Sequence, residues 1–184
     1  VYAYEAYVTN GFNDRIIDNS QGRTSLPAAK EDRDRFEESF NGSPMITAKA
    51  AIKHKKIAEV GLSYMSGIYN KFEDDGLILD KKRAVNIYAI DANTTLLRIR
   101  TYINAEWVWV RADVPQVYTQ QYGQRQTGGF ADIVQPVFSG NVFGFKTSVI
   151  NLACRLEYVD WNVGKFNETG TNIADDFWGI TPGI

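Results

Sequence analysis

The sequence predicts an all-β fold, an antiparallel transmembrane β-barrel, on the strength of three observations. Apolar and polar residues alternate over long segments, the connections between these segments alternate in length, and aromatic residues make up 13% of the chain. The longest alternating segment, 96–111, has one face of Leu97, Ile99, Ile103, Ala105, Trp107 and Trp109 and another of Arg98, Arg100, Tyr102, Asn104 and Glu106. A strand that crosses a bilayer obliquely needs about 9–11 such residues, so this segment is long enough to span one.

Composition is consistent with a single domain, residues 1–184, and disfavours several kinds of partner. The formal net charge is -2 and the basic residues form no single block, which argues against nucleic acid. Cys154 is the only cysteine, so the chain has no internal disulfide framework. No apolar run approaches the roughly 20 residues of a spanning helix, so a membrane would have to be crossed by strands.

Eight segments have the pattern of strands. In chain order they are about 1–9, 44–53, 57–66, 83–92, 96–111, 130–138, 147–159 and 176–184. The segments 44–53, 57–66 and 147–159 are the clearest besides 96–111, because each has an apolar face opposite a polar one. Pro136 and Pro182 each remove a ladder donor, which favours a bulge, an edge or a strand end in the last segments.

The connections alternate in length, as in a barrel with short periplasmic turns and long external loops. Long connections are expected near 10–43, 67–82, 112–129 and 160–175, and shorter ones at 54–56, 93–95 and 139–146. We expect the turns at 54–56 and 93–95 to hold three residues each, with Glu59 beside Lys49 and Lys53. Residues 28–40 suit a short charged helix, either solvated or folded into the pore so that it narrows it.

The polar faces of these strands carry the residues that we predict to line a pore. They are Glu5, Lys49, Lys53, Glu59, Arg98, Arg100, Glu106, Arg155 and Glu157. Burying these charges in a dry core would cost several kcal/mol apiece unless they were paired, whereas a wet lumen removes that cost. Positive and negative groups nearly balance in this set, so the sequence predicts at most modest ion selectivity.

Aromatic residues near the strand ends are predicted to lie at the membrane interfaces, where amphipathic rings are enriched. These residues are Tyr64, Trp107, Trp109, Tyr158 and Trp178.

No catalytic or metal-binding pattern is present in the sequence. His54 is the only histidine and lies in a short turn beside three lysines, which is a poor setting for a general base. Cys154 alternates with apolar residues, so we expect a packed or lipid-facing thiol. We therefore predict that the protein is not an enzyme and uses no metal or cofactor.

Three stretches resemble the bacterial outer-membrane porins related to the phosphate-selective porin O and P family. They are YEAYVTNGF at 4–12, DVPQVYTQQYGQRQTGGFADIVQPVF at 113–138, and LACRLEYVDWNVGKFNETGTNIADDFWGITPGI at 152–184. The resemblance implies a barrel of about sixteen strands, commonly trimeric, through which small solutes or ions diffuse across the outer membrane. It also implies a lipid bilayer and lipopolysaccharide as surroundings.

Two other functions remain open at the level of the sequence. A complete eight-stranded barrel with a packed interior would serve as a structural anchor or adhesin. A soluble β-barrel that binds a hydrophobic ligand or a glycan would bury Ile99, Ile103, Trp107 and Leu152, whereas a porin exposes them. Eight strands are about half of the resembled barrel, so we expect an internal stretch of a longer porin with an open edge at each end.

Overall fold

The computed structural model describes residues 1–30, 40–55 and 57–184, and most of them form one antiparallel sheet. Its eight strands are β1 (Tyr2–Asn10), β2 (Pro44–His54), β3 (Ala58–Ile68), β6 (Ala84–Leu96), β7 (Thr101–Ala112), β8 (Arg125–Val142), β9 (Phe145–Asp160) and β10 (Asp176–Gly183). The connections hold two short 3-10 helices, η1 (Asp14–Ile16) and η2 (Pro27–Lys30), and a small hairpin of β4 (Glu73–Asp74) and β5 (Leu77–Ile78). The prediction of eight antiparallel strands is confirmed.

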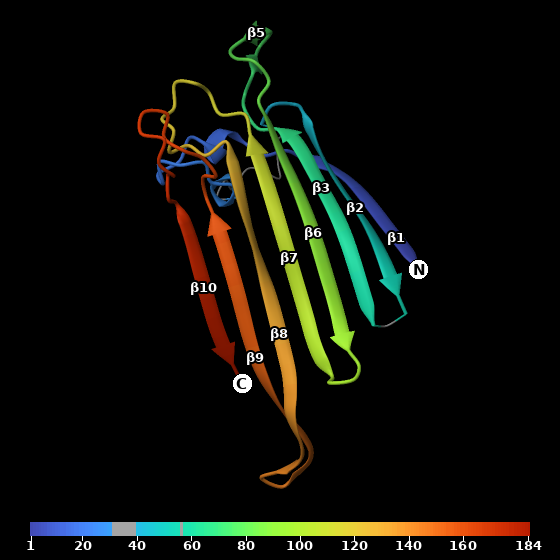
Figure 1. Ribbon diagram of the computed structural model, residues 1–184. Coiled ribbons are helices and arrows are strands. Elements are labelled where there is room, and N and C mark those ends of the chain that lie inside the picture. The colour runs from blue at the N-terminus through green and yellow to red at the C-terminus, as the bar shows by residue number, and fades with distance from the viewer. Residues whose placement is uncertain (31–39, 56) are drawn as a thin grey trace.

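The strands follow one another in the sheet in chain order (Figure 1). In the part of the chain that the structure describes, β1 and β10 lie at opposite edges and each has one neighbour, so the sheet is open and does not close into a barrel. All the long connections lie at one end of the sheet, which we call the loop end, and the short turns lie at the other, the turn end (Figure 1).

Cross-strand register gives the sheet two chemically different faces. One row of directly opposed residues runs through Tyr4, Ala50, Leu62, Ile90, Trp107, Gly129, Tyr158 and Trp178. The adjacent row runs through Ala51, Gly61, Asp91, Glu106, Phe130, Glu157 and Gly179. The first row belongs to what we call the apolar face and the second to the charged face.

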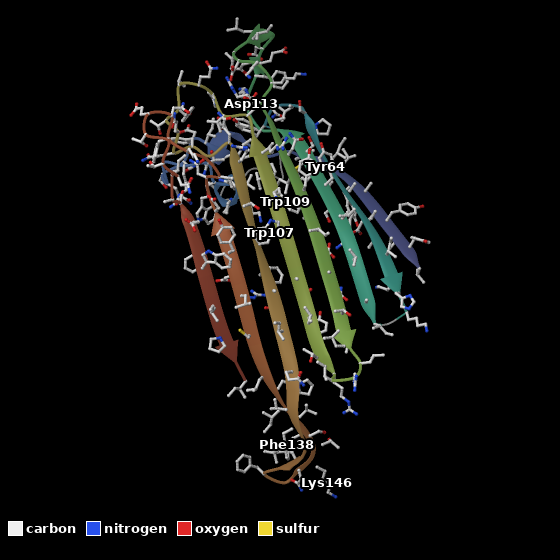
Figure 2. The ribbon with its side chains drawn as sticks, viewed as in Figure 1. Tyr64, Trp107, Trp109, Asp113, Phe138 and Lys146 are labelled. Atoms are coloured by element: carbon white, nitrogen blue, oxygen red, sulfur yellow. The ribbon has the colours of Figure 1, made fainter. Side chains whose placement is uncertain are left out.

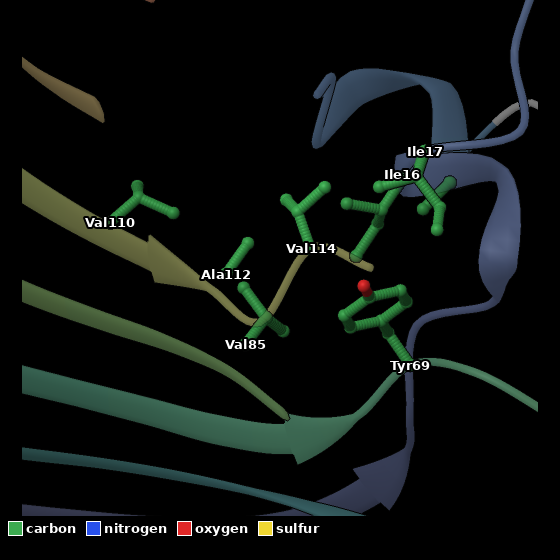
Figure 3. Packing of buried hydrophobic residues seen from close by; sticks show 8 residues of the cluster. Ile16, Ile17, Tyr69, Val85, Val110, Ala112 and Val114 are labelled. Atoms are coloured by element: carbon green, nitrogen blue, oxygen red, sulfur yellow. The ribbon is translucent and has the colours of Figure 1, made fainter. Parts of the chain in front are cut away.

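The hydrophobic core is small and lies on the charged face at the loop end. Val85, Val110 and Ala112 come from the ends of β6 and β7, and they pack with the buried Tyr69 against Ile16, Ile17 and Ala29. Figure 3 shows the first connection beside the ends of these strands, with Ile16 and Ile17 on the side of Tyr69. The described part of the first long connection, residues 11–30, is therefore folded over the sheet; we call it the first loop.

Several expected boundaries are wrong. The strand expected over 96–111 begins only at Thr101, because Leu97–Arg100 form a four-residue turn. The other short turn does hold three residues, but they are 55–57, and Lys53 stands directly opposite Glu59. The strand expected over 130–138 extends over Arg125–Val142. Gly128 and Gly129 therefore lie in a strand and not in the expected connection at 112–129.

Pro136 and Pro182 lie where the absence of a backbone hydrogen-bond donor is tolerated. The ladder between β8 and β9 shifts register just after Pro136, and Pro182 lies on the edge strand β10. The expected charged helix at 28–40 overlaps η2 at its start, and residues 31–39 lie outside the described part of the chain.

Candidate functional site

The charged face carries three ion pairs that link neighbouring strands. Lys53 lies 2.6 Å from Glu59, and Lys49 lies 2.7 Å from Asp91. Arg155 binds Asp132 with two parallel hydrogen bonds, each of 2.7 Å. The bidentate geometry fixes the Arg155 guanidinium in place. Each basic residue on this face of the described strands thus has an acidic partner.

Gly61 leaves room for the Lys49–Asp91 pair. The pair joins β2 to β6 across the intervening strand β3, and Gly61 lies between them on β3. A Cβ atom at position 61 would lie 2.5 Å from Asp91 Oδ1 and 2.8 Å from Lys49 Cε. The missing side chain therefore leaves the space in which the two charged groups meet.

Three carboxylates on the charged face have no basic partner among the described residues: Glu5, Glu106 and Glu157. Glu5 accepts a hydrogen bond of 2.9 Å from the Tyr7 hydroxyl. Glu106 and Glu157 stand on either side of Phe130 in one row of the ladder. Since the Arg155 guanidinium, 4.6 Å from the Phe130 ring centroid, is already paired with Asp132, the centre of this face is left negative.

The structure brings most of the predicted pore residues onto one face, but two belong elsewhere. Arg98 and Arg100 lie in the exposed turn before β7, beyond the strand on which they were expected. Asp91 and Asp132 were not among the predicted residues, although both occupy polar positions in the alternating pattern of their strands. The charged face of the described strands therefore carries six carboxylates against three basic groups, namely Glu5, Glu59, Asp91, Glu106, Asp132 and Glu157 against Lys49, Lys53 and Arg155.

The first loop is attached to the charged face by specific polar contacts as well as by the core. Gln126 is buried on β8, and its Nε2 donates a hydrogen bond of 2.7 Å to the Thr24 carbonyl oxygen. Arg23 lies 3.3 Å from Asp175 in the last long connection, with its guanidinium 5.7 Å from the centroid of the Trp161 ring. These contacts tie the first loop to elements far away in sequence.

A second polar cluster joins the connections at the loop end. Arg83 donates from Nε to Asp80 at 2.6 Å and lies 3.4 Å from Asp113. The hydrogen bond from Arg83 holds the pKa of the Asp80 carboxyl below its ordinary value. Tyr69 donates from its hydroxyl to the Asp113 carbonyl oxygen at 2.7 Å, and burial raises its pKa. The cluster therefore anchors the connections beside the core.

A cavity of about 410 Å³ lies between the first loop and the charged face. Its walls include Leu26 and Pro27 of the first loop, Trp161, and the side chains of Glu106, Phe130, Arg155 and Glu157. The cavity is thus bounded on one side by the first loop, and its other wall includes two of the unpaired carboxylates, Glu106 and Glu157.

The apolar face has a cluster of aromatic rings near the loop end. Trp107 and Tyr158 stack with centroids 5.8 Å apart, and Tyr158 lies 4.6 Å from Trp178. A Cβ atom at Gly129, between Trp107 and Tyr158 on the ladder, would lie 2.6 Å from the Trp107 ring and would collide with the Glu106 carbonyl oxygen.

The cluster continues on the neighbouring strands. Tyr64 lies 5.1 Å from Tyr88, which stands opposite Trp109. Figure 2 shows Tyr64, Trp107 and Trp109 toward the loop end, with Phe138 and Lys146 at the opposite end. We call these rings the aromatic belt: Tyr64, Tyr88, Trp107, Trp109, Tyr158 and Trp178.

Between the aromatic belt and the turn end, the apolar face of the described strands carries no Asp, Glu or Arg, and Lys146 lies only at the tip of the β8–β9 hairpin. From Trp109 to the start of β7 this band is about 27 Å long along the strand, or about 20 Å along the membrane normal at a tilt of about 40°. The side chains are exposed: Leu62 is 61% exposed, Leu152 49% and Trp178 69%. The face is therefore bare and apolar over about 20 Å of height, close to the roughly 25 Å of the apolar band on outer-membrane barrels.

No helix in the described residues is long and apolar enough to cross a membrane. Within the same residues, no group of three or more His, Cys, Asp or Glu side chains is placed to hold a metal ion. No protein-family model matches the chain, and neither a curated protein nor a solved structure is detectably similar to it. The resemblance to the porin O and P family stays a prediction.

Proposed function

We propose that this chain forms part of the wall of a transmembrane β-barrel in the bacterial outer membrane, and that the barrel is a porin for passive diffusion of small hydrophilic solutes or ions. The apolar face meets lipid and the charged face meets the aqueous lumen. The first loop extends over the lumen face and narrows the passage. Chemistry plays no part in this function, since the residues act through the shape and the field of the pore.

The observation that carries the proposal is the uncovered band of apolar side chains between the aromatic belt and the turn end of the apolar face. Monomeric soluble proteins rarely expose contiguous apolar patches larger than a few hundred Å², because such a patch would associate with others in water. Here the exposed apolar side chains extend over all eight strands, from Tyr4 on β1 to Ile180 on β10. A bilayer gives this face a solvent of matching polarity, and the aromatic belt suits the boundary with the headgroups.

The charged face supports the same orientation. The nine charged side chains on this face of the strands would need strong compensation in a dry interior, and only six of them are paired with each other. In a lumen, water solvates the three that remain.

The two unpaired edges indicate that β1 and β10 pair with further strands. Backbone donors and acceptors at an open edge cannot be satisfied by lipid, so a sheet in a bilayer must close. We propose closure into a barrel of about sixteen strands, which leaves an aqueous passage where eight would not. A homotrimer surrounded by lipopolysaccharide and phospholipid is the assembly that the resemblance implies.

Reconstitution tests the proposal. The complete barrel to which we assign this chain, refolded into vesicles of zwitterionic phospholipid, should float with the lipid and give stepwise ion conductance in planar bilayers. Leu62→Glu places a charge on the lipid-facing side and should lower the yield of insertion and the stability of the inserted protein, whereas the matched control Ser63→Glu, one residue further on the lumen side, should insert and conduct as the parent does.

Two outcomes would overturn the proposal. A protein that inserts without conducting would instead be a structural barrel with a packed interior. A protein that stays soluble without lipid, and whose Leu62→Glu variant is as stable as the parent, would be a soluble β-protein.

A further inference from the structure

We propose that Arg111 and Arg125 form a binding site for the phosphate group of an outer-leaflet lipid. The inference rests on the proposed function, because the two side chains meet lipid only if the apolar face does. It adds a specific lipid partner and a position for it on the sheet.

The site is built by direct opposition of two arginines across a ladder. Arg111 on β7 pairs with Arg125 on β8, and both share the face of Trp109. Both are exposed, and neither forms an ion pair among the described residues. Like charges directly opposite each other destabilise a sheet, so a shared anion between them would turn a repulsion into two attractions. Arginine suits phosphate because its planar fork forms two parallel hydrogen bonds.

A cavity of about 510 Å³ lies at the arginine pair. Tyr88, Trp109 and Thr127 line it below the arginines, and Val163 of the last long connection lines it as well. The backbone N–H of Val163 donates to the Arg125 carbonyl oxygen at 2.8 Å, which holds this connection beside the pair. The volume is that of a small-molecule site, large enough for a phosphate with part of the sugar or glycerol that carries it.

The height of the site on the sheet favours a lipid phosphate over a free one. Arg111 is two residues beyond Trp109 toward the loop end, or about 7 Å along the strand. Aromatic belts lie at the headgroup level, so the guanidinium groups stand where lipid phosphates lie. Below the arginines the apolar face continues through Trp109 and Trp107, against which the acyl chains of the same molecule can pack. Free phosphate would gain the arginine contacts alone.

Lipid binding by the refolded protein tests the site. The parent and the variants are incubated in neutral detergent with diphosphoryl lipid A, with the same lipid after removal of its phosphates, or with inorganic phosphate, and bound ligand is measured by native mass spectrometry. We expect R111Q/R125Q to bind diphosphoryl lipid A at least about tenfold more weakly than the parent. The matched control R98Q/R100Q loses the same charge in the turn after β6 and should bind as the parent does.

A second variant and a second readout guard against simple misfolding. R111K/R125K keeps both charges but loses the bidentate fork, so its affinity should fall between those of the parent and R111Q/R125Q. Without lipid A, R125Q should melt slightly above the parent because the repulsion is gone; with lipid A bound, it should melt below.

The proposal fails if R111Q/R125Q binds lipid A as tightly as the parent, or if the dephosphorylated lipid binds equally well. Inorganic phosphate that binds as tightly as lipid A would overturn the assignment to a lipid. Flotation with zwitterionic vesicles separates the two proposals. A protein that floats but fails these tests loses the lipid site and keeps the porin function, whereas a protein that does not float loses both.

Discussion

Removing the two unpaired carboxylates below the first loop should reduce the preference of the pore for cations. The variant is E106Q/E157Q, which keeps the shape of both side chains and removes two negative charges. Glu106 and Glu157 are separated by one intervening strand, so their backbones lie about 10 Å apart and a cation midway is about 5 Å from each.

The size of the effect follows from that distance. In water such a cation gains about 1.7 kcal/mol from the pair, and about 1 kcal/mol after screening by 0.1 M salt. An anion loses as much, so the local preference is about 2 kcal/mol, or roughly thirtyfold. Ions that pass further from the wall interact more weakly with the two carboxylates. We therefore expect the measured cation-to-anion permeability ratio to fall about threefold in the variant.

The assay is the reversal potential of single channels in a planar bilayer under a KCl gradient. The other charges of the barrel wall are the same in the variant and the parent, so the difference between their reversal potentials reports the two carboxylates alone. The control is E73Q/E168Q, which removes the same charge from β4 and from the last long connection. An unchanged reversal potential in E106Q/E157Q, or an equal shift in the control, would refute the claim that these carboxylates face the conduction path.

Three further predictions concern the packing of the sheet and of the first loop. G129A should destabilise the protein by about 2–3 kcal/mol in urea unfolding, because the added Cβ meets backbone, whereas G183A should change little since its Cβ has ordinary contacts; equal effects would contradict the packing described. Q126A removes a buried hydrogen bond to the first loop, so it should raise both the proteolysis rate of that loop and the open-channel current noise, and a variant indistinguishable from the parent would refute the attachment. The hydrogen bond from Arg83 lowers the pKa of Asp80. The stabilisation of the fold by this pair is therefore present above about pH 4, where an unfolded aspartate is ionised, and it is lost as the pH falls through the lowered pKa of Asp80. Below about pH 4, thermal unfolding of D80N should depend less on pH than thermal unfolding of the parent.

The two-residue alternation of polar and apolar residues predicted the number of strands and their faces. It does so because successive side chains of a strand point to opposite faces, and the polarity of each side chain shows whether its face meets water or an apolar surface. It could not locate the turns. Lys55 and Arg100 adopt positive φ angles of 53° and 57°, a conformation more typical of Gly, Asn or Asp. With no such residue at either turn, residue types alone could not show that the strand expected at 96 begins at Thr101.

The folding of the first loop onto the sheet had a local signal that the sequence prediction did not use. Val108 and Val110 lie on the same face of β7 as Glu106, so the charged face becomes apolar toward the loop end of this strand. An apolar patch on a water-facing side indicates that another segment covers it. The identity of the covering segment, around Ile16, depends on contacts between residues distant in sequence, which a local pattern does not contain.

Accessibility along β7 tests the central claim, that one face of the sheet meets lipid and the other water. Single cysteines at Ile103, Asn104, Ala105 and Glu106 in a C154A background would be spin-labelled in vesicles, and their collisions with oxygen and with a water-soluble nickel complex compared. We predict a strict period of two, with positions 103 and 105 open to oxygen and positions 104 and 106 open to nickel. Equal accessibility of all four positions to the nickel complex would contradict the account.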